Sequence, residues 1–300
     1  MTNSTKEVDG ATRARIDGLF ELLGEDSCIN PEQRHKLRQR IDGVIDYHAS
    51  VGVLGKTGAG KSSLCNALFG QDVAHVSAVD ACTREPQEII LALNNGKGIS
   101  LIDVPGVGES ETRDAEYTTL YRNLLPKLDL LLWVIKGDDR ALSVDLRFFK
   151  QIVQPQIVAT DLPVVFVVNQ ADKVEPSTEW DWKRCVPGPE QGRNIERKLA
   201  SVSRTFELPL SHICAVSAGQ NYGLITLVEN IVRRLPNEKK WGFTREAKEE
   251  NVSDKAREES ERGLWETIKA VIAEIVTEGS ELIAAKLALI AKHFCGGFMN

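Results

Sequence analysis

The stretch GKTGAGKSS, residues 55–63, constrains the fold of this chain more than any other, because it directly follows the apolar run 49–54. Its Gly55, Gly60, Lys61 and Ser62 satisfy the pattern G-x-x-x-x-G-K-[ST]. Glycines let the backbone curl with its N–H groups pointing inward, and a helix start and the Lys61 ammonium add positive charge. We therefore expect a strand, a polyphosphate-binding loop and a helix over 62–69. The candidate phosphate-binding residues are Gly55, Lys56, Thr57, Gly58, Ala59, Gly60, Lys61, Ser62 and Ser63.

Short apolar runs alternate with amphipathic segments through the middle of the chain. The runs span 51–54, 89–93, 99–102, 128–135, 164–168 and 213–216. Continuous apolar strands separated by helical patterns are typical of a buried, mostly parallel sheet. The sequence therefore predicts an α/β domain over 48–236, with a mostly parallel six-stranded sheet and helices on both faces.

Helical patterns flank this domain on both sides. We expect an N-terminal helical extension over 1–47, in which Asn30 caps a helix that begins with Pro31. Residues 237–300 are predicted to form a charged linker and amphipathic C-terminal helices. Twelve of the eighteen residues 245–262 are charged, which favours a solvated helix or linker there. The apolar stripe over 264–294 is expected to pack against the N-terminal helices, with a membrane surface as the weaker alternative because its polar face is acid-rich. The insertion 175–192 receives no role.

Composition excludes some functions. The 300 residues carry a net charge of -6, which argues against non-specific nucleic-acid binding as the main activity. The six cysteines lie far apart with no CxxC pair, so we expect free thiols rather than disulfides or a zinc site. We find neither a secretory leader nor an uncharged run of membrane-spanning length, and so expect a cytoplasmic protein.

Three further motifs end apolar strands. Asp103, in LIDVPG, can hold a magnesium-bound water, and the Gly106 N–H can approach a γ-phosphate because no side chain blocks it. In VVNQAD, the Asp172 carboxylate can accept from N1–H and the 2-amino group of guanine, two donors that adenine lacks. Ser217 and Ala218 can present backbone N–H groups to the guanine O6. Because ligands bind at the carboxyl ends of strands in open α/β sheets, we expect these motifs to meet there.

Together the motifs resemble those of P-loop GTPases of the translation-factor-related class, in the Era-like group, and most closely the YfjP/YeeP-type GTP-binding proteins of bacterial prophage-like regions. GKTGAGKSS resembles the family's first motif, DVPG its third, NQAD a variant of its fourth and SA its fifth. The stretch ACTRE at 81–85 is similar to the Thr-Thr-Arg stretch of Era-like proteins. The resemblance covers residues 48–236.

The resemblance implies a P-loop NTPase fold, with GTP or GDP as the ligand and Mg²⁺ as the cofactor. The implied catalytic residues are Lys61, Thr83 and Gly106. The implied metal-binding residues are Ser62, Thr83 and Asp103, the last through a water molecule. The implied base-binding residues are Asn169, Gln170, Asp172, Ser217 and Ala218.

Three departures from the family pattern bear on activity. Gln170 replaces the usual lysine that stacks on the base, which lowers the expected affinity but leaves the guanine preference. Val107 stands where Ras-like enzymes carry the glutamine that orients the attacking water, and valine cannot do so. Gly58 replaces the asparagine associated with K⁺ sites in Era-like enzymes. The implied hydrolysis is therefore slow without dimerisation or a partner.

These features leave rival functions open. The leading hypothesis is a molecular switch in which GTP and Mg²⁺ order Thr83 and the segment after Gly106, with a ribosome or RNA partner by family analogy alone. The second is a GTP-gated, septin-like self-assembling protein at a membrane or scaffold, with a homodimer formed through the GTPase domain. An ATPase is disfavoured, because Asp172 has no role on adenine.

Overall fold

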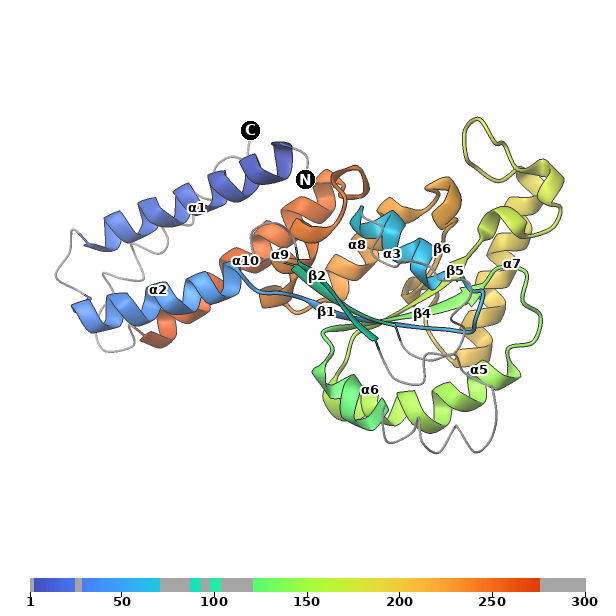
Figure 1. The fold of residues 1–300 in the computed structure, drawn as a ribbon, viewed down its shortest axis with the longest axis horizontal. Helices are drawn as coiled ribbons and strands as arrows, with labels where there is room; N and C mark the ends of the chain where they lie inside the picture. Colours follow the sequence, from blue (N-terminus) through green and yellow to red (C-terminus); the bar gives the residue numbers. More distant parts are fainter. Residues whose placement is uncertain (1–2, 25–28, 71–86, 93–97, 104–120, 276–300) are drawn as a thin grey trace.

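The computed structural model describes residues 3–24, 29–70, 87–92, 98–103 and 121–275, with the backbone alone for 3–9, 11, 22–24, 87–92 and 98–103. Within these residues the chain forms a sheet covered by helices and, beside it, an arm of helices (Figure 1).

The sheet has six strands in the order β2-β3-β1-β4-β5-β6. They are β1 (Ser50–Leu54), β2 (Gln87–Ala92), β3 (Gly98–Asp103), β4 (Leu130–Lys136), β5 (Val164–Asn169) and β6 (Ile213–Ala215). Among these strands all neighbours pair in parallel except β2, which lies at the edge antiparallel to β3. The predicted P-loop NTPase fold, with its mostly parallel six-stranded sheet, is confirmed.

Helices cover both faces of the sheet, as predicted. α3 (Lys61–Phe69), α8 (Leu224–Arg234) and α9 (Asn237–Glu246) pack around one apolar cluster. α5 (Ser143–Phe148), α6 (Gln154–Thr160) and α7 (Pro189–Phe206) contribute to a second cluster on the other face. At its centre the Phe166 ring lies 4.8 Å from Phe206 and 5.9 Å from Trp133, centroid to centroid. β4 and β5 are buried on both sides for this reason, which accounts for their uninterrupted apolar sequence.

The arm consists of α1 (Asn3–Gly24), α2 (Pro31–Ile45) and α10 (Asp254–Ile275), and it extends away from the sheet (Figure 1). Asn30 caps α2 as predicted: its side chain accepts from the Gln33 backbone N–H, and the Gln33 side chain accepts from the Asn30 N–H. The expected packing of the C-terminal stripe on the N-terminal helices is confirmed as far as Ile275, and the remainder lies outside the described residues. The shared apolar core is Ile16, Leu19, Phe20, Leu37, Ile41, Ile45, Trp241, Leu264, Trp265, Ile268, Val271 and Ile272.

The expected solvated helix or linker over 245–262 is wrong at its start. Arg245 and Glu246 are 8% and 6% exposed, and their Nε and Oε1 atoms form an ion pair at 2.7 Å. Arg245 also donates to the backbone carbonyls of Ile45 and Tyr47 at the end of α2. The Arg245 guanidinium thus has backbone and carboxylate partners where the arm joins the sheet, and Glu246 is buried with Arg245 as its partner.

Residues 175–188 of the insertion form a turn ahead of α7, and its last four residues begin that helix. Asp181 and Val186 pair through an antiparallel bridge. Trp180 is buried, with its ring 5.5 Å from that of Tyr222, whereas Trp182 is 63% exposed. One tryptophan therefore anchors the turn and the other is presented to solvent.

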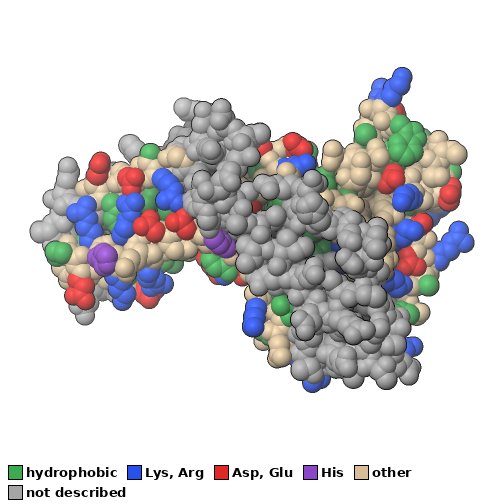
Figure 2. Space-filling view, viewed as in Figure 1, with side chains coloured by type: hydrophobic (Ala, Val, Ile, Leu, Met, Phe, Trp, Pro, Cys, Tyr) green, Lys and Arg blue, Asp and Glu red, His purple; other side chains and the backbone are tan. Residues whose placement is uncertain are grey.

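The surface of the arm carries both signs of charge, with acidic and basic side chains intermixed over α1 and α2 (Figure 2). A helix long and apolar enough to cross a membrane is absent from the described part of the chain. Cys65, Cys185 and Cys214 are not in disulfides, in agreement with the sequence, and the other three cysteines lie outside the described residues.

Candidate functional site

Residues 55–60 connect β1 to α3 in a loop that depends on glycine. Gly55, Gly58 and Gly60 have φ angles of 152°, 81° and 84°. A Cβ atom on Gly55 would lie 2.2 Å from the Val134 carbonyl oxygen, and one on Gly60 would lie 2.5 Å from Asn169 Nδ2. Positions 55 and 60 therefore require glycine both for backbone conformation and for space.

α3 begins at the end of this loop without a side-chain cap, because its N-cap residue is Gly60. The N–H groups of the first turn keep their partial positive charge at the loop. Lys61, the first residue of α3, donates from Nζ to the Gly55 carbonyl oxygen at 3.2 Å, so its ammonium lies across the loop. Ser62 and Ser63 follow in the same turn, with Thr57 exposed on the loop. The local structure is that of an anion-binding helix N-terminus.

Asn169, the last residue of β5, joins three loops. Its side chain is 1% exposed and donates from Nδ2 to the carbonyl oxygens of Ala59, at 2.9 Å, and Gly60, at 3.2 Å. Its Oδ1 accepts from the Ala218 backbone N–H at 3.2 Å. The segments that follow β1, β5 and β6 are thus held together by one buried amide.

Gln170 adds a further hydrogen bond between the segment after β5 and the glycine loop. Its backbone is left-handed, with φ 60°, and its Nε2 donates to the Gly58 carbonyl oxygen at 2.9 Å. Its Oε1 accepts from Lys173 Nζ at 3.1 Å. The Gln170 amide therefore packs on the glycine loop.

Asp172 and Ser217 meet beside this junction. Ser217, 1% exposed, donates from Oγ to Asp172 Oδ1 at 2.5 Å. Gln191 of α7, fully buried, donates from Nε2 to the carbonyl oxygens of Asp172, at 3.1 Å, and Val174, at 2.8 Å. Gln191 was missed in the sequence, since a lone glutamine in a helix carries no signal of the loop that it supports.

The remaining predicted residues are placed only in part. Asp103 ends β3, where its register partner in β1 is Val53, so its backbone reaches the same edge of the sheet as the glycine loop. The Asp103 side chain, and all of Thr83, Gly106 and Val107, lie outside the described residues.

Lys56 points its amine at the loop that follows β4. Its Nζ lies 2.6 Å from Asp145 Oδ2 and 3.0 Å from Asp139 Oδ2, and it donates to the Ala141 carbonyl oxygen at 2.6 Å. Burial lowers the pKa of Lys56, but the bonds to Asp145 and Asp139 together raise it by more, so the amine remains charged. Lys198, in α7, donates from its amine to the backbone carbonyl oxygen of Asp139.

This cluster was not identified from the sequence. Asp139 and Asp145 belong to the segment KGDDRALSVD at 136–145, whose only signal is its charge. Asp145 is 2% exposed, and burial raises the pKa of its carboxyl group despite the nearby Lys56. The Lys56 side chain is thereby committed to carboxylates, so any contact of this residue with a phosphate falls to its backbone N–H.

A glycine loop before α3, a buried asparagine that ties it to the next loops, and an Asp–Ser pair beside them together define a P-loop nucleotide-binding protein. Residues 50–170 match the family model described as 50S ribosome-binding GTPase. YkfA of Escherichia coli (strain K12) is 40% identical over 240 residues, 80% of each chain. YfjP of the same organism is 38% identical over 242 residues, 81% of each chain, and both are described as uncharacterized proteins. GTPase Era of Thermoanaerobacter sp. (strain X514) is 26% identical over 192 residues, covering 64% of this chain and 56% of that one.

Identity and coverage at the level of YkfA and YfjP establish common ancestry over most of the length. The chain belongs to the family of P-loop GTPases that includes these two proteins, and it is related to Era at lower identity. The resemblance predicted from the motifs is confirmed.

Proposed function

We propose that the protein is a GTP-dependent molecular switch with slow intrinsic hydrolysis. The observation that carries the proposal is the Asn169 amide, which bonds the glycine loop through Ala59 and Gly60 and the segment after β6 through Ala218. A phosphate-binding loop and a base-binding loop joined in this way respond together to one nucleotide.

The phosphates of the nucleotide lie in the loop 55–63 in this proposal. The uncapped start of α3 offers backbone N–H groups, and Lys61 supplies a full positive charge. The 3.2 Å bond from Lys61 to the Gly55 carbonyl oxygen is exchanged for a phosphate oxygen, a stronger charge-assisted bond.

Guanine binds beside Asp172. The carboxylate accepts from N1–H and the 2-amino group, and the bond from Ser217 holds that carboxylate in place. Asn169 and Gln170 support the base-binding loop through their bonds to Ala218 and Gly58. The backbone N–H groups that were expected to face the guanine O6 are engaged within the chain, that of Ala218 with Asn169 Oδ1 and that of Ser217 with the Tyr222 carbonyl oxygen. Adenine offers neither of the two donors. The site therefore discriminates against ATP because the Asp172 carboxylate receives no hydrogen bond from the base.

The residues present fit a Mg²⁺ ion. A hydroxyl at Ser62, in the first turn of α3, and a carboxylate at Asp103, on the neighbouring strand of the same sheet edge, are oxygen ligands of the kind this ion prefers. When bound, Mg²⁺ neutralises charge that develops on the phosphate oxygens. Thr83 completes the metal-binding residues, and the Gly106 N–H and Lys61 contact the γ-phosphate.

Slow hydrolysis follows from Val107, which offers no group to orient the attacking water. The matching family is described as ribosome-binding, which supports a ribosome or RNA partner that reads the GTP-bound state. Alternatively, a second copy of the chain, bound through the GTPase domain, supplies the group that orients the attacking water.

Nucleotide binding and single-turnover hydrolysis test the proposal. Fluorescent GTP and ATP analogues are titrated into the full chain with Mg²⁺, and we expect GTP to bind and ATP not to compete. Asp172→Asn should reduce the preference for GTP over ATP by about 10²- to 10⁴-fold, because an amide presents a donor where the carboxylate accepts. Asp181→Asn, in the insertion turn, is the matched control and should leave it unchanged.

Hydrolysis is then followed as a function of protein concentration. A rate per molecule that rises with concentration places the missing group on a second copy, and a flat, slow rate directs the search to another partner. Equal affinity for ATP and GTP, or full selectivity in Asp172→Asn, would overturn the guanine assignment.

A further inference from the structure

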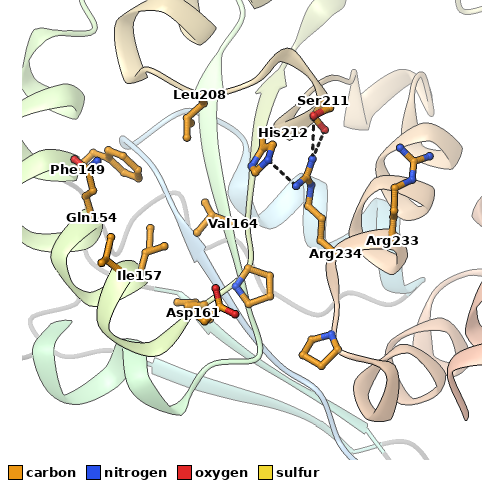
Figure 3. A pocket seen from close by; sticks show the side chains of 14 residues that line it. Phe149, Gln154, Ile157, Asp161, Val164, Leu208, Ser211, His212, Arg233 and Arg234 are labelled. Carbon is orange, nitrogen blue, oxygen red and sulfur yellow. Dashed lines mark hydrogen bonds between the residues drawn. The ribbon is translucent and has the colours of Figure 1, made fainter. Parts of the chain in front are cut away.

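A cleft of about 850 Å³ opens at the amino ends of the parallel strands, opposite to the glycine loop at their carboxyl ends. Val164 and His212, which line it, lie at the amino ends of β5 and β6, whereas the glycine loop follows the carboxyl end of β1 (Figure 3). Because these strands are parallel, the cleft and the glycine loop are separated by the length of the strands. The cleft is therefore independent of the nucleotide site.

The floor of the cleft is apolar. Phe149, Leu162 and Val164 are 2%, 4% and 9% exposed and belong to the aromatic cluster beneath it. Val158 stands at its rim with 77% of its surface exposed. The volume lies within the range of about 300–1,000 Å³ that small-molecule sites occupy, and such sites are lined mainly by apolar side chains with a few polar groups.

Arg234, at the end of α8, forms one wall and is held by neutral acceptors. Its Nε donates to Asn230 Oδ1 at 2.7 Å. Its Nη1 donates to His212 Nε2 at 2.8 Å, and its Nη2 donates to the Ser211 carbonyl oxygen at 2.6 Å (Figure 3). Burial and the neighbouring Arg233 lower the pKa of Arg234. The guanidinium is thus oriented and partly desolvated, with no carboxylate among its partners in the described residues.

Arg233 lies beside it, is exposed, and forms no ion pair with any residue that the structure describes. Among the described residues that line the cleft, only Asp161 carries a carboxylate, and it likewise has no ion-pair partner in that part of the chain. His212 accepts from Arg234 and burial lowers its pKa, so the imidazole is neutral. Two guanidinium groups against one carboxylate leave an excess positive charge above an apolar floor.

We propose that this cleft binds a small amphipathic organic anion, with its acidic group at Arg233 and Arg234 and its apolar body on the floor formed by Phe149, Leu162 and Val164. An anionic group supplies the counter-charge that the protein does not, and guanidinium groups form strong, directional bonds to carboxylate, sulfonate and phosphate oxygens. A purely structural role, in which Arg234 ties α8 to the segment before β6, would explain the position of Arg234. It would explain neither the lack of an ion-pair partner for Arg233 among the described residues nor the open apolar cleft.

Binding is measured by calorimetric titration of the full chain with octanoate and with naphthalene-1-sulfonate, and octylammonium serves as the probe of opposite charge. Arg233→Gln is the first variant, since Arg233 has no bond to break in the described fold. We expect it to weaken octanoate binding at least about threefold, and Arg233→Gln with Arg234→Gln at least about tenfold. Arg197→Gln removes the same charge from the middle of α7, at a residue that does not line the cleft, and should leave binding unchanged.

Asp161→Asn gives a test with the opposite sign. Asp161 has φ 53°, a backbone conformation that asparagine tolerates well, so the fold is retained while the repelling carboxylate is removed. We expect tighter octanoate binding in this variant and unchanged GTP binding in all of them.

Failure of both anions to bind saturably at millimolar concentrations would overturn the proposal. Octylammonium binding as tightly as octanoate, or Arg233→Gln binding as the parent does, would overturn it as well. None of these results bears on the GTP site, because the two lie at opposite edges of the sheet.

Discussion

Replacement of Asn169 by alanine tests the idea that one buried amide organises the nucleotide site. The side chain forms three hydrogen bonds, to Ala59, Gly60 and Ala218, at 2.9, 3.2 and 3.2 Å. A hydrogen bond contributes about 0.5–1.5 kcal/mol net, so three give about 2–4 kcal/mol. The loops bind GTP in the arrangement that these bonds hold, and the loss should appear as a decrease in affinity of about 30- to 1,000-fold.

The assay combines two measurements. Titration with a fluorescent GTP analogue gives the affinity, and urea unfolding followed by tryptophan fluorescence gives the change in the free energy of unfolding. Asn230→Ala is the matched control, because Asn230 is also buried, at 9% exposed, and forms hydrogen bonds with Ser211 and Arg234 near the amino ends of the strands, away from the glycine loop.

The two variants should separate stability from binding. Both should lower the free energy of unfolding, and only Asn169→Ala should lose GTP. If Asn169→Ala binds GTP within threefold of the parent, or if Asn230→Ala loses GTP to the same extent, the reasoning from the three hydrogen bonds is wrong.

Three further predictions concern the glycine loop, the cleft and the core. Gly60→Ala should destabilise the nucleotide-free protein more than Gly58→Ala in thermal unfolding. Each variant places alanine at a positive φ, which costs about 1–2 kcal/mol, but only the Cβ atom at position 60 meets Asn169. Equal losses of stability in the two variants would contradict this reasoning. Burial, then Arg234, lowers the pKa of His212, so the unfolded chain binds more protons below about pH 6.5. The free energy of unfolding should therefore fall as pH decreases through that value and stay level above it; His212→Gln should flatten the dependence, and an unchanged slope would refute the assignment. Phe166→Ala should cost about 3–5 kcal/mol in urea unfolding, since Phe166 is fully buried between other aromatic rings, and a loss below 1 kcal/mol would show that the cluster rearranges.

The glycine loop could be predicted from the sequence because its parts are consecutive. Strand, loop and helix start lie within 50–69, and both the glycine positions and the hydrogen-bonding chemistry can be assigned from neighbouring residues. The alternation of apolar runs likewise predicted the sheet, since strands buried on both faces leave a signal in each run by itself. The capping box at Asn30 and Gln33 is equally local.

Contacts between distant segments were decided only by the tertiary structure. Lys56 binds Asp139 and Asp145 more than eighty residues away, and the sequence does not distinguish an unpaired lysine in a glycine loop from one that pairs with carboxylates. Arg245 and Glu246 belong to a run of charges that predicts solvent exposure, yet the end of α2 supplies carbonyl oxygens that accept from the buried Arg245, and Arg245 in turn pairs with Glu246.

The cleft is the fullest example of this division. Its floor comes from β5 and the segments between α5 and β5, and its charged wall comes from the end of α8 and the segment before β6. By itself the sequence determined the fold class and the glycine loop, because each depends on periodicity or on spacing within a few residues, and the resemblance of its short motifs supplied the candidate guanine-binding residues. Only the tertiary structure decided which charges are paired, which are buried and which remain without a counter-ion, because these depend on the packing of segments far apart in the chain.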